Sequence, residues 1–424
     1  MPTSALLQLT ARGRQDAYLT GNPQFTFFKH IYRRYTPFAI ESIPIDFDGD
    51  TDFGRRISTV IPRYADLLSS LFIEVDLPPL PQSTLLGAPL NYWVNDIGYT
   101  LIHDVSVEIG EREIDKHTGE WLNIWGELTV PKNQRQGYNE MVGHWDVYPP
   151  APNDATTPLK LTIPLRFWFC NTIGAALPLI ALQAHPVRII MHLRPFQELW
   201  WSQLIPAAPG QPCPTLAPVS ITRFQMFGDY VYLDTDERRK FAAADHEYLI
   251  DQLQISPIQS LQIGVSTATV PLYFNHCCKE FVWVIQETRM KVAREWFNYS
   301  SALQYDGGAP GEIDEDLMAT AILRLDGSDR FYVRNAPYFR LTQPYQHHTV
   351  VPTPPVYIYL YSFSMKPEAE QPSGSLNCSK IDDINWTLTF NPDHVDQDRT
   401  VRFYGTNYNV LRIVGGLGGL AFIA

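Results

Sequence analysis

The sequence predicts an all-β protein built as two tandem β-sandwiches, and three observations carry this prediction. Aromatic residues make up 13% of the chain, and aromatic side chains favour strands. The 34 prolines and 25 glycines mark frequent turns and would interrupt the helices of a bundle. The 424 residues suit two domains of about 200 residues each. Hydrophobic residues (45%) far outnumber charged ones (18%), which indicates a folded chain with a large core.

Strands and one short helix are expected in the first half. Leu71–Leu77 and Val105–Ile109 alternate between apolar and polar residues, as half-buried strands do. Between Lys116 and Val130, four apolar residues recur at helical spacing and predict a helix with one core-facing side. The uncharged residues 167–187 contain Pro178 and Pro186, and we expect a strand-turn-strand pair there instead of a membrane span. The four apolar helix residues are Trp121, Ile124, Trp125 and Leu128.

A Pro-rich linker near the middle separates this half from a similar second half. Residues 221–233 read as a long strand, and Asp234 with Glu237 resembles the capping box of a helix that continues to about Leu253. The linker prolines are Pro206, Pro209, Pro212, Pro214 and Pro218. Later strands are expected at residues 279–286, 321–325, 356–364, 385–390 and 408–414.

Charge and cysteine usage narrow the class of protein. The formal net charge is −12, which disfavours a protein whose whole surface binds nucleic acid. Residues 1–40 differ from the rest of the chain in carrying a net positive charge, because this segment contains five basic residues and a single acidic one, Asp16. That segment is either a solvated arm or a contact for an anionic surface. Five cysteines without disulfide-type spacing, and no secretory signal, predict free thiols in a reducing compartment.

The motif search predicts neither an active site nor a cofactor. Gly416–Ala421 imitates a dinucleotide-binding fingerprint, but no helix and second strand follow, so close backbone packing at a terminal strand is expected. His276, Cys277 and Cys278 are adjacent and point to opposite faces of a strand, which argues against a shared metal. The acidic residues at 46–52 fail the EF-hand pattern and indicate a solvated loop. We therefore expect no metal, no cofactor and no catalytic residues. The N-x-[ST] sequons at Asn298, Asn377 and Asn385 are only weakly supported as glycosylation sites.

Long ordered motifs from residue 6 to the C-terminal region resemble the double jelly-roll major capsid proteins of nucleocytoplasmic large DNA viruses, of the iridovirus and phycodnavirus type. The sharpest block is Tyr361–Ser375, with the sequence YSFSMKPEAEQPSGS. One departure is Cys378, where an aromatic residue is expected. The other blocks that carry the resemblance are residues 6–24, 26–29, 32–34, 114–117, 120–125, 164–170, 176–182, 231–239, 379–382 and 408–413, together with Asn377.

The resemblance implies a structural, non-enzymatic role. It implies two eight-stranded antiparallel jelly rolls with short helices in their loops, and three chains forming a pseudo-hexagonal capsomer that tiles an icosahedral shell. Expected partners are other copies of the chain, minor capsid and penton proteins, and the inner viral membrane, without sequence-specific nucleic-acid binding and without a small-molecule substrate. The expected location is the virion, assembled in the host cytoplasm. The expected parts are an inner-face segment (1–30), a first jelly roll (31–205), the linker (206–218) and a second jelly roll (219–424). The inner-face contacts would be Arg12, Arg14, Lys29, Arg33 and Arg34.

Three alternatives belong to other classes. The first is a minor or penton-type jelly-roll protein of the same virions. The second is a carbohydrate-binding jelly roll, for which Trp200 and Trp201 are the suggestive pair, although core or interface packing is expected there. The third is a glycosidase using Glu312 or Asp314, which requires two carboxyl groups about 5–10 Å apart in a cleft.

Overall fold

The computed structural model describes residues 3–82, 90–147, 149–151, 156–202, 215–304, 314–354 and 356–423. The chain divides into two compact units, residues 1–37 and residues 38–424, here called the arm and the body. In the arm, two short helices are followed by a segment without regular structure. These helices are α1 (Thr3–Thr10) and α2 (Asp16–Thr20).

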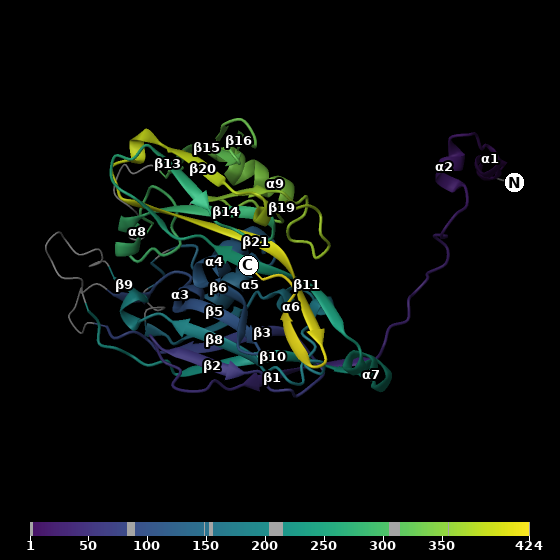
Figure 1. The fold of residues 1–424 in the computed structure, drawn as a ribbon, viewed down its shortest axis with the longest axis horizontal. Helices are drawn as coiled ribbons and strands as arrows, with labels where there is room; N and C mark the ends of the chain where they lie inside the picture. The colour runs from purple at the N-terminus through teal and green to yellow at the C-terminus, as the bar shows by residue number, and fades with distance from the viewer. Residues whose placement is uncertain are drawn as a thin grey trace. The chain divides into compact units, whose positions relative to one another are not determined.

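The body begins with a jelly roll made of two antiparallel sheets (Figure 1). Buried and partly exposed residues alternate along β3, since successive side chains of a strand point to opposite faces. The inner faces of both sheets contribute to one core, which contains Ile73 and Val107. The first sheet has the order β1 (Phe38–Ile45), β10 (Arg223–Leu233), β3 (Leu67–Leu77) and β7 (Leu159–Pro164). The second has the order β2 (Arg56–Val60), β8 (Val187–Leu193), β5 (Ile102–Ile109) and β6 (Arg112–Thr118).

A second jelly roll repeats this strand arrangement with its own core. Trp283 lies near the centre of that core, with ring centroids 4.5 Å from Trp386 and 5.4 Å from Phe403. One sheet has the order β11 (His246–Ile255), β21 (Arg399–Val414), β14 (Cys277–Glu287) and β18 (Ile358–Ser362). The other has the order β13 (Thr267–Leu272), β20 (Ile384–Phe390), β15 (Met318–Leu325) and β16 (Ser328–Asp329), with β17 (Arg334–Asn335) also paired to β15.

Short elements connect the strands of both jelly rolls. In the first jelly roll and its connection to the second they are β4 (Asn91–Trp93), α3 (Ile97–Leu101), α4 (Gly119–Thr129), α5 (Arg135–Val142), α6 (Trp168–Asn171), η2 (Ile173–Ala175), η3 (Phe196–Glu198), β9 (Trp200–Ser202) and α7 (Thr235–Ala243). In the second they are β12 (Gln259–Leu261), α8 (Thr288–Val292), η5 (Tyr338–Thr342), α9 (Gln343–His347), β19 (Leu376–Asn377), η6 (Cys378–Lys380), η7 (Pro392–His394) and β22 (Leu417–Leu420).

Most predicted strands are present, and the predicted helix between Lys116 and Val130 is α4. Its N-cap is Thr118, whose Oγ1 accepts a hydrogen bond from the Trp121 backbone N–H at 3.2 Å. The strands predicted in the second half correspond to β14, β15, β18, β20 and β21, of which β21 is longer than expected because it begins at Arg399.

Two local predictions are wrong. The helix that begins after Asp234 ends at Ala243 and does not reach Leu253. It buries no side chain, whereas His246–Ile255 pairs with β21 along ten residues, so the sheet decides the conformation there. The expected strand-turn-strand pair at residues 167–187 consists of α6 and η2, and only Val187 begins a strand.

The boundary expected at residue 219 also differs from the division between the sheets. Arg223–Leu233 forms β10, which pairs with β1 on one side and with β3 on the other. This strand therefore completes the first jelly roll, and the Pro-rich stretch 206–218 precedes it. Residues 206–214 of that stretch lie outside the described residues. Local composition suggested a linker between domains, but the pairing of β10 with strands far away in sequence places it in the first sheet.

A C-terminal hairpin connects the second jelly roll to the first. Gly415 and Gly416 have positive φ angles of 58° and 85° and form the turn between β21 and β22. A Cβ atom on Gly418 would lie 2.7 Å from a Leu182 side-chain carbon and 2.9 Å from one of Ile109, so a larger residue would fit only if these side chains shifted. The predicted close packing is thus present at Gly416 and Gly418, which contact the first jelly roll, whereas a Cβ atom on Gly415 or Gly419 would have no neighbour within 4 Å.

Candidate functional site

The two jelly rolls share side chains where they meet. Helix α4 follows a strand of the first jelly roll, yet Trp121, Ile124 and Leu128 belong to the core of the second. In the opposite direction, Leu411 and Ile413 of β21 belong to the core of the first. Each core is therefore complete only when the other jelly roll is in place, and this junction is the candidate functional site.

A buried ion pair fixes α4 on the second jelly roll. Glu120 contacts the Arg402 guanidinium and accepts hydrogen bonds from the hydroxyls of Tyr299 (3.0 Å) and Tyr404 (2.5 Å). Arg402 also donates to Oε1 of Gln286 at 3.0 Å. Burial raises the pKa of the Glu120 carboxyl, but attraction to Arg402 and these hydrogen bonds outweigh burial and lower it. The carboxylate is thus charged and fully partnered, which a buried ion pair requires in order to be tolerated.

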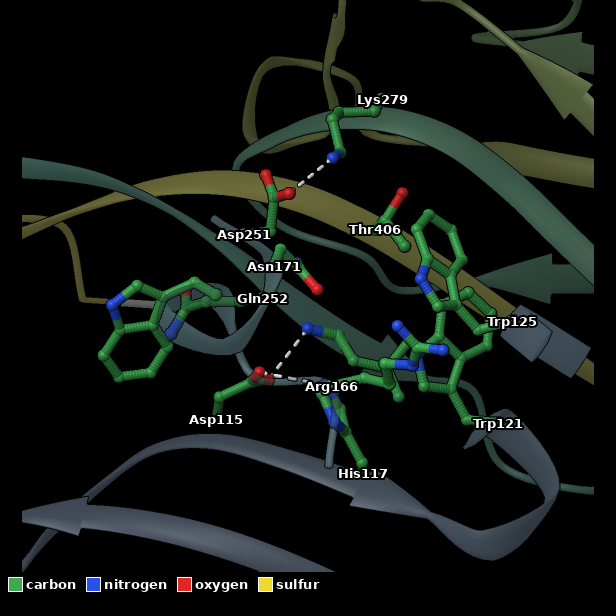
Figure 2. Close-up of a pocket in the computed structure, with 12 residues that line it drawn as sticks. Asp115, His117, Trp121, Trp125, Arg166, Asn171, Asp251, Gln252, Lys279 and Thr406 are labelled. Atoms are coloured by element: carbon green, nitrogen blue, oxygen red, sulfur yellow. Dashed lines mark hydrogen bonds and ion pairs between the residues drawn. The ribbon is translucent and has the colours of Figure 1, made fainter. Parts of the chain in front are cut away.

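A second group of charged side chains surrounds a small cavity at the same junction. Figure 2 shows Asp115 and His117 from the first jelly roll on one side, and Asp251 with Lys279 from the second on the other. Asp115 Oδ2 lies 3.0 Å from His117 Nε2, and Lys279 Nζ lies 2.8 Å from Asp251 Oδ2. Burial raises the pKa of Asp251, against the attraction of Lys279. The cavity volume is about 30 Å³, which is room for a water molecule and too little for an organic substrate.

Backbone groups also connect the two jelly rolls at this cavity. The Leu253 N–H of β11 donates to the Asp115 carboxylate at 3.0 Å, and the Gln252 side chain donates to the Ile114 carbonyl. His117 stacks on Phe167 with ring centroids 4.9 Å apart. Strand β11 is thereby held against β6 by hydrogen bonds that set the position of one sheet relative to the other.

His348 of the second jelly roll packs against α4 at the edge of the junction. Its Nε2 lies 2.7 Å from Glu280 and its Nδ1 lies 2.8 Å from Glu368, and its side chain is fully buried beside the Trp125 ring. Burial lowers the pKa of His348, but the two carboxylates raise it to about 9. With a carboxylate at each nitrogen, the ring is a charged double donor at neutral pH.

The five basic residues predicted to contact an inner surface all lie in the arm and are exposed. They are not part of the junction. Their contact with the inner viral membrane or with minor capsid proteins stays a prediction. The residues are Arg12, Arg14, Lys29, Arg33 and Arg34.

The three sequons differ in accessibility. Asn298 is buried, and its side-chain amide donates to Glu295 and to the Ala302 carbonyl at 2.8 Å. It has no access to a glycosylating enzyme in the folded chain. Asn377 is exposed. Asn385 is half-buried on β20, and its amide donates to both carboxylate oxygens of Asp383 at 2.7 Å.

The other motifs from the sequence are explained by packing. Trp200 and Trp201 are each 1% exposed in the first core, so they do not form a sugar-stacking surface. Asp314 is described and Glu312 is not, so their separation lies outside the described residues.

Among the residues that the structure describes, no group of three or more His, Cys, Asp or Glu side chains is arranged to hold a metal ion. Within the same residues, no helix has both the length and the apolar character needed to cross a membrane.

Sequence reasoning missed the charged junction because its partners are distant in the chain. Glu120 and Arg402 are 282 residues apart in the chain, and the local sequence around either residue gives no indication of the other. The available signal was the isolated Glu120 at the start of a helix whose next residue, Trp121, faces a core. An acidic side chain in that position needs a buried partner.

Comparisons with known proteins cover nearly all of the chain. The family profile described as "Major capsid protein N-terminus" matches residues 26–234, and the profile described as "Large eukaryotic DNA virus major capsid protein" matches residues 237–419. The major capsid protein of Pyramimonas orientalis virus is 39% identical, with 98% of each chain covered. That of Phaeocystis pouchetii virus is 36% identical, with 98% of this chain and 99% of the relative covered. The solved structure of the PBCV-1 virus capsid has a TM-score of 0.78 at 31% identity, covering 94% of this chain and all of that one.

Proposed function

Since this chain belongs to the major capsid proteins of large eukaryotic DNA viruses, we propose that three copies associate into a capsomer with a pseudo-hexagonal outline. The protein is a structural component of the virion capsid, with the double jelly-roll fold. The observation that supports the trimer is the repeat inside the body: two jelly rolls with the same strand order meet through a large shared interface. Three such pairs supply six similar blocks, as a hexagonal outline requires.

The capsomers would tile an icosahedral shell through contacts smaller and more polar than those inside the trimer. Many weak contacts add up in a closed shell, while single misplaced capsomers still dissociate. We propose that the chain has a structural role and no catalytic one, and the family membership supports this. We place its assembly in the host cytoplasm.

We further propose that the arm faces the shell interior. The arm contains both exposed basic residues and exposed aromatic side chains such as Phe27 and Phe28. This combination suits an anionic lipid surface, because cations are attracted to the headgroups and aromatic rings lie at the membrane interface. Minor capsid and penton proteins are the further partners that we propose for the assembled shell.

Light scattering coupled to size exclusion tests the trimer. We expect a mass about three times 48.4 kDa for the purified protein, and a pseudo-hexagonal outline in electron micrographs of the same fraction. A stable monomer at all concentrations up to the micromolar range would contradict the proposal.

A further inference from the structure

The two jelly rolls can be aligned residue by residue at a shared irregularity. In the first, the pairing of β10 with β3 skips Ser69, and in the second, the pairing of β21 with β14 skips Lys279. Counting from these two bulges, Phe227 of β10 occupies the position that Tyr404 of β21 occupies in its own sheet. Both side chains lie on the outer face of their sheet, opposite to the neighbouring residues Met226 and Phe403 of the same strands, and on this outer face Tyr404 joins the second core by packing against α4.

In the second jelly roll, helix α4 covers this outer face. The Trp121 ring lies 5.3 Å from the Tyr404 ring, and Glu120 is paired with Arg402 two residues along the same face. Helix α4 directly follows β6, the last strand of the other sheet of the first jelly roll. Within the chain, the helix that follows β6 of the first jelly roll therefore packs on the outer face of the second jelly roll.

In the first jelly roll, the equivalent face carries apolar side chains that remain accessible in the described body. Phe227 is half-buried, and Phe72, directly opposite it on β3, is also half-buried. Ile40 is 48% exposed on β1, on the same face. We call this surface, formed by Ile40, Phe72 and Phe227 with the polar row Ser42, Asp229 and Ser70 between them, the seat.

The second jelly roll carries a helical segment at the place that corresponds to α4. Elements η5 and α9 follow β17 as α4 follows β6. Tyr345 is 80% exposed and Leu341 is 39% exposed on this segment, and Tyr332 and Val333 just before β17 are 89% and 58% exposed. Four large apolar side chains in one short stretch are typical of an interaction surface.

We propose that the η5–α9 segment of one copy binds the seat of a second copy, repeating between chains the contact that α4 makes within the chain. Each copy offers one segment and one seat, so the contact is head-to-tail. Head-to-tail contacts that repeat with the same rotation close into a ring when that rotation divides a full turn, and the proposed trimer requires the six jelly rolls of three copies to form such a ring. This inference rests on the proposed trimer and specifies which surfaces form it.

Two substitutions at the proposed interface test it against a control elsewhere. In light scattering, we expect Tyr345→Glu and Ile40→Glu to shift the protein from three times 48.4 kDa to 48.4 kDa, because each places a charge in an apolar contact. Tyr273→Glu, at a tyrosine that is 77% exposed elsewhere in the second jelly roll, is expected to leave the trimer intact. Trimers in both interface variants would overturn the inference and leave the proposed function standing, whereas a monomeric wild-type protein would overturn both.

A cross-link locates the contact without disturbing the fold. A benzophenone amino acid at position 345 is expected to cross-link, between two copies, to the tryptic peptide 224–238 or to residues within 38–45. Mixing isotope-labelled and unlabelled protein before assembly distinguishes a cross-link between copies from one within a copy. Cross-links to residues 1–37 would show that the arm occupies this surface and would overturn the inference.

Discussion

At the residue scale, the Glu120–Arg402 pair decides how the two jelly rolls are joined. Arg402→Met leaves the Glu120 carboxylate buried without its charged partner, and we expect a loss of about 3–5 kcal/mol in the free energy of unfolding. Arg412→Met is a matched control on the same strand, because Arg412 and its partner Glu247 are both more than half exposed. The control is expected to cost less than about 1 kcal/mol. Urea denaturation followed by tryptophan fluorescence measures both, and equal losses would contradict a special role for the buried pair.

His348 makes the stability depend on pH. Its pKa is about 9 in the folded chain and 6.5 as the reference value, so folding favours the protonated ring. The stabilisation is fully present below pH 6.5 and is lost as pH rises from 6.5 to 9. His348→Gln is expected to flatten the fall of the free energy of unfolding across this window. His144 beside Asp96 has a pKa raised to about 9 by the same kind of contact, so part of the slope will remain. A slope that does not change in the variant would contradict the assignment.

At the element scale, α4 couples the unfolding of the two jelly rolls, because it belongs to the first in sequence and packs in the core of the second. Trp121 is 3% exposed and fills part of the second core, so Trp121→Ala is expected to cost about 3–5 kcal/mol. Calorimetry of the full chain should show the whole body losing stability together, because both cores depend on this helix. Ile173→Ala, at a residue that is 57% exposed, is the control and should change the stability by less than about 0.5 kcal/mol. Two separate transitions in the wild-type protein would contradict the coupling.

The sequence predicted elements well where the signal was local. The spacing of Trp121, Ile124 and Leu128 predicted a helix with one apolar side, but it did not reveal that this side faces the core of the other jelly roll. Strand β10 was also predicted, yet its partners β1 and β3 lie far away in sequence, so its place in the first sheet was missed. The helix after Asp234 was extended too far because pairing of residues 246–255 with β21 outweighs local helix signals. Junction pairs such as Glu120 with Arg402 are set by the topology, which residue patterns alone do not specify.

At the scale of the whole molecule, the proposed membrane contact lies in the arm alone, so it can be tested separately from the trimer. We expect the chain to float with vesicles that contain phosphatidylserine, and this binding to weaken as salt rises. Replacing Arg12, Arg14, Lys29, Arg33 and Arg34 with Gln should reduce the bound fraction at least tenfold, since each cation near the surface contributes about 1 kcal/mol. The trimer mass should be unchanged in this variant.

The matched control for the arm replaces two exposed basic residues of the body, Arg239 and Lys240, with Gln. Its binding to the same vesicles should equal that of the wild-type chain. The membrane contact would be refuted if the arm variant bound these vesicles as well as the wild-type chain does. It would also be refuted if virus that carries the variant attached its shell normally and gave normal yields.

The shared cores also have a consequence for the timing of synthesis. Leu411 and Ile413 complete the first core, and Gly418 packs against Leu182, so the first jelly roll is finished by residues that leave the ribosome only after most of the second jelly roll has been made. Most multidomain chains fold their N-terminal domain while the rest is still being made. Here the N-terminal half is left incomplete until then. A nascent chain therefore presents no finished building block until both jelly rolls have been synthesised, and shell growth can recruit only chains that have reached this stage.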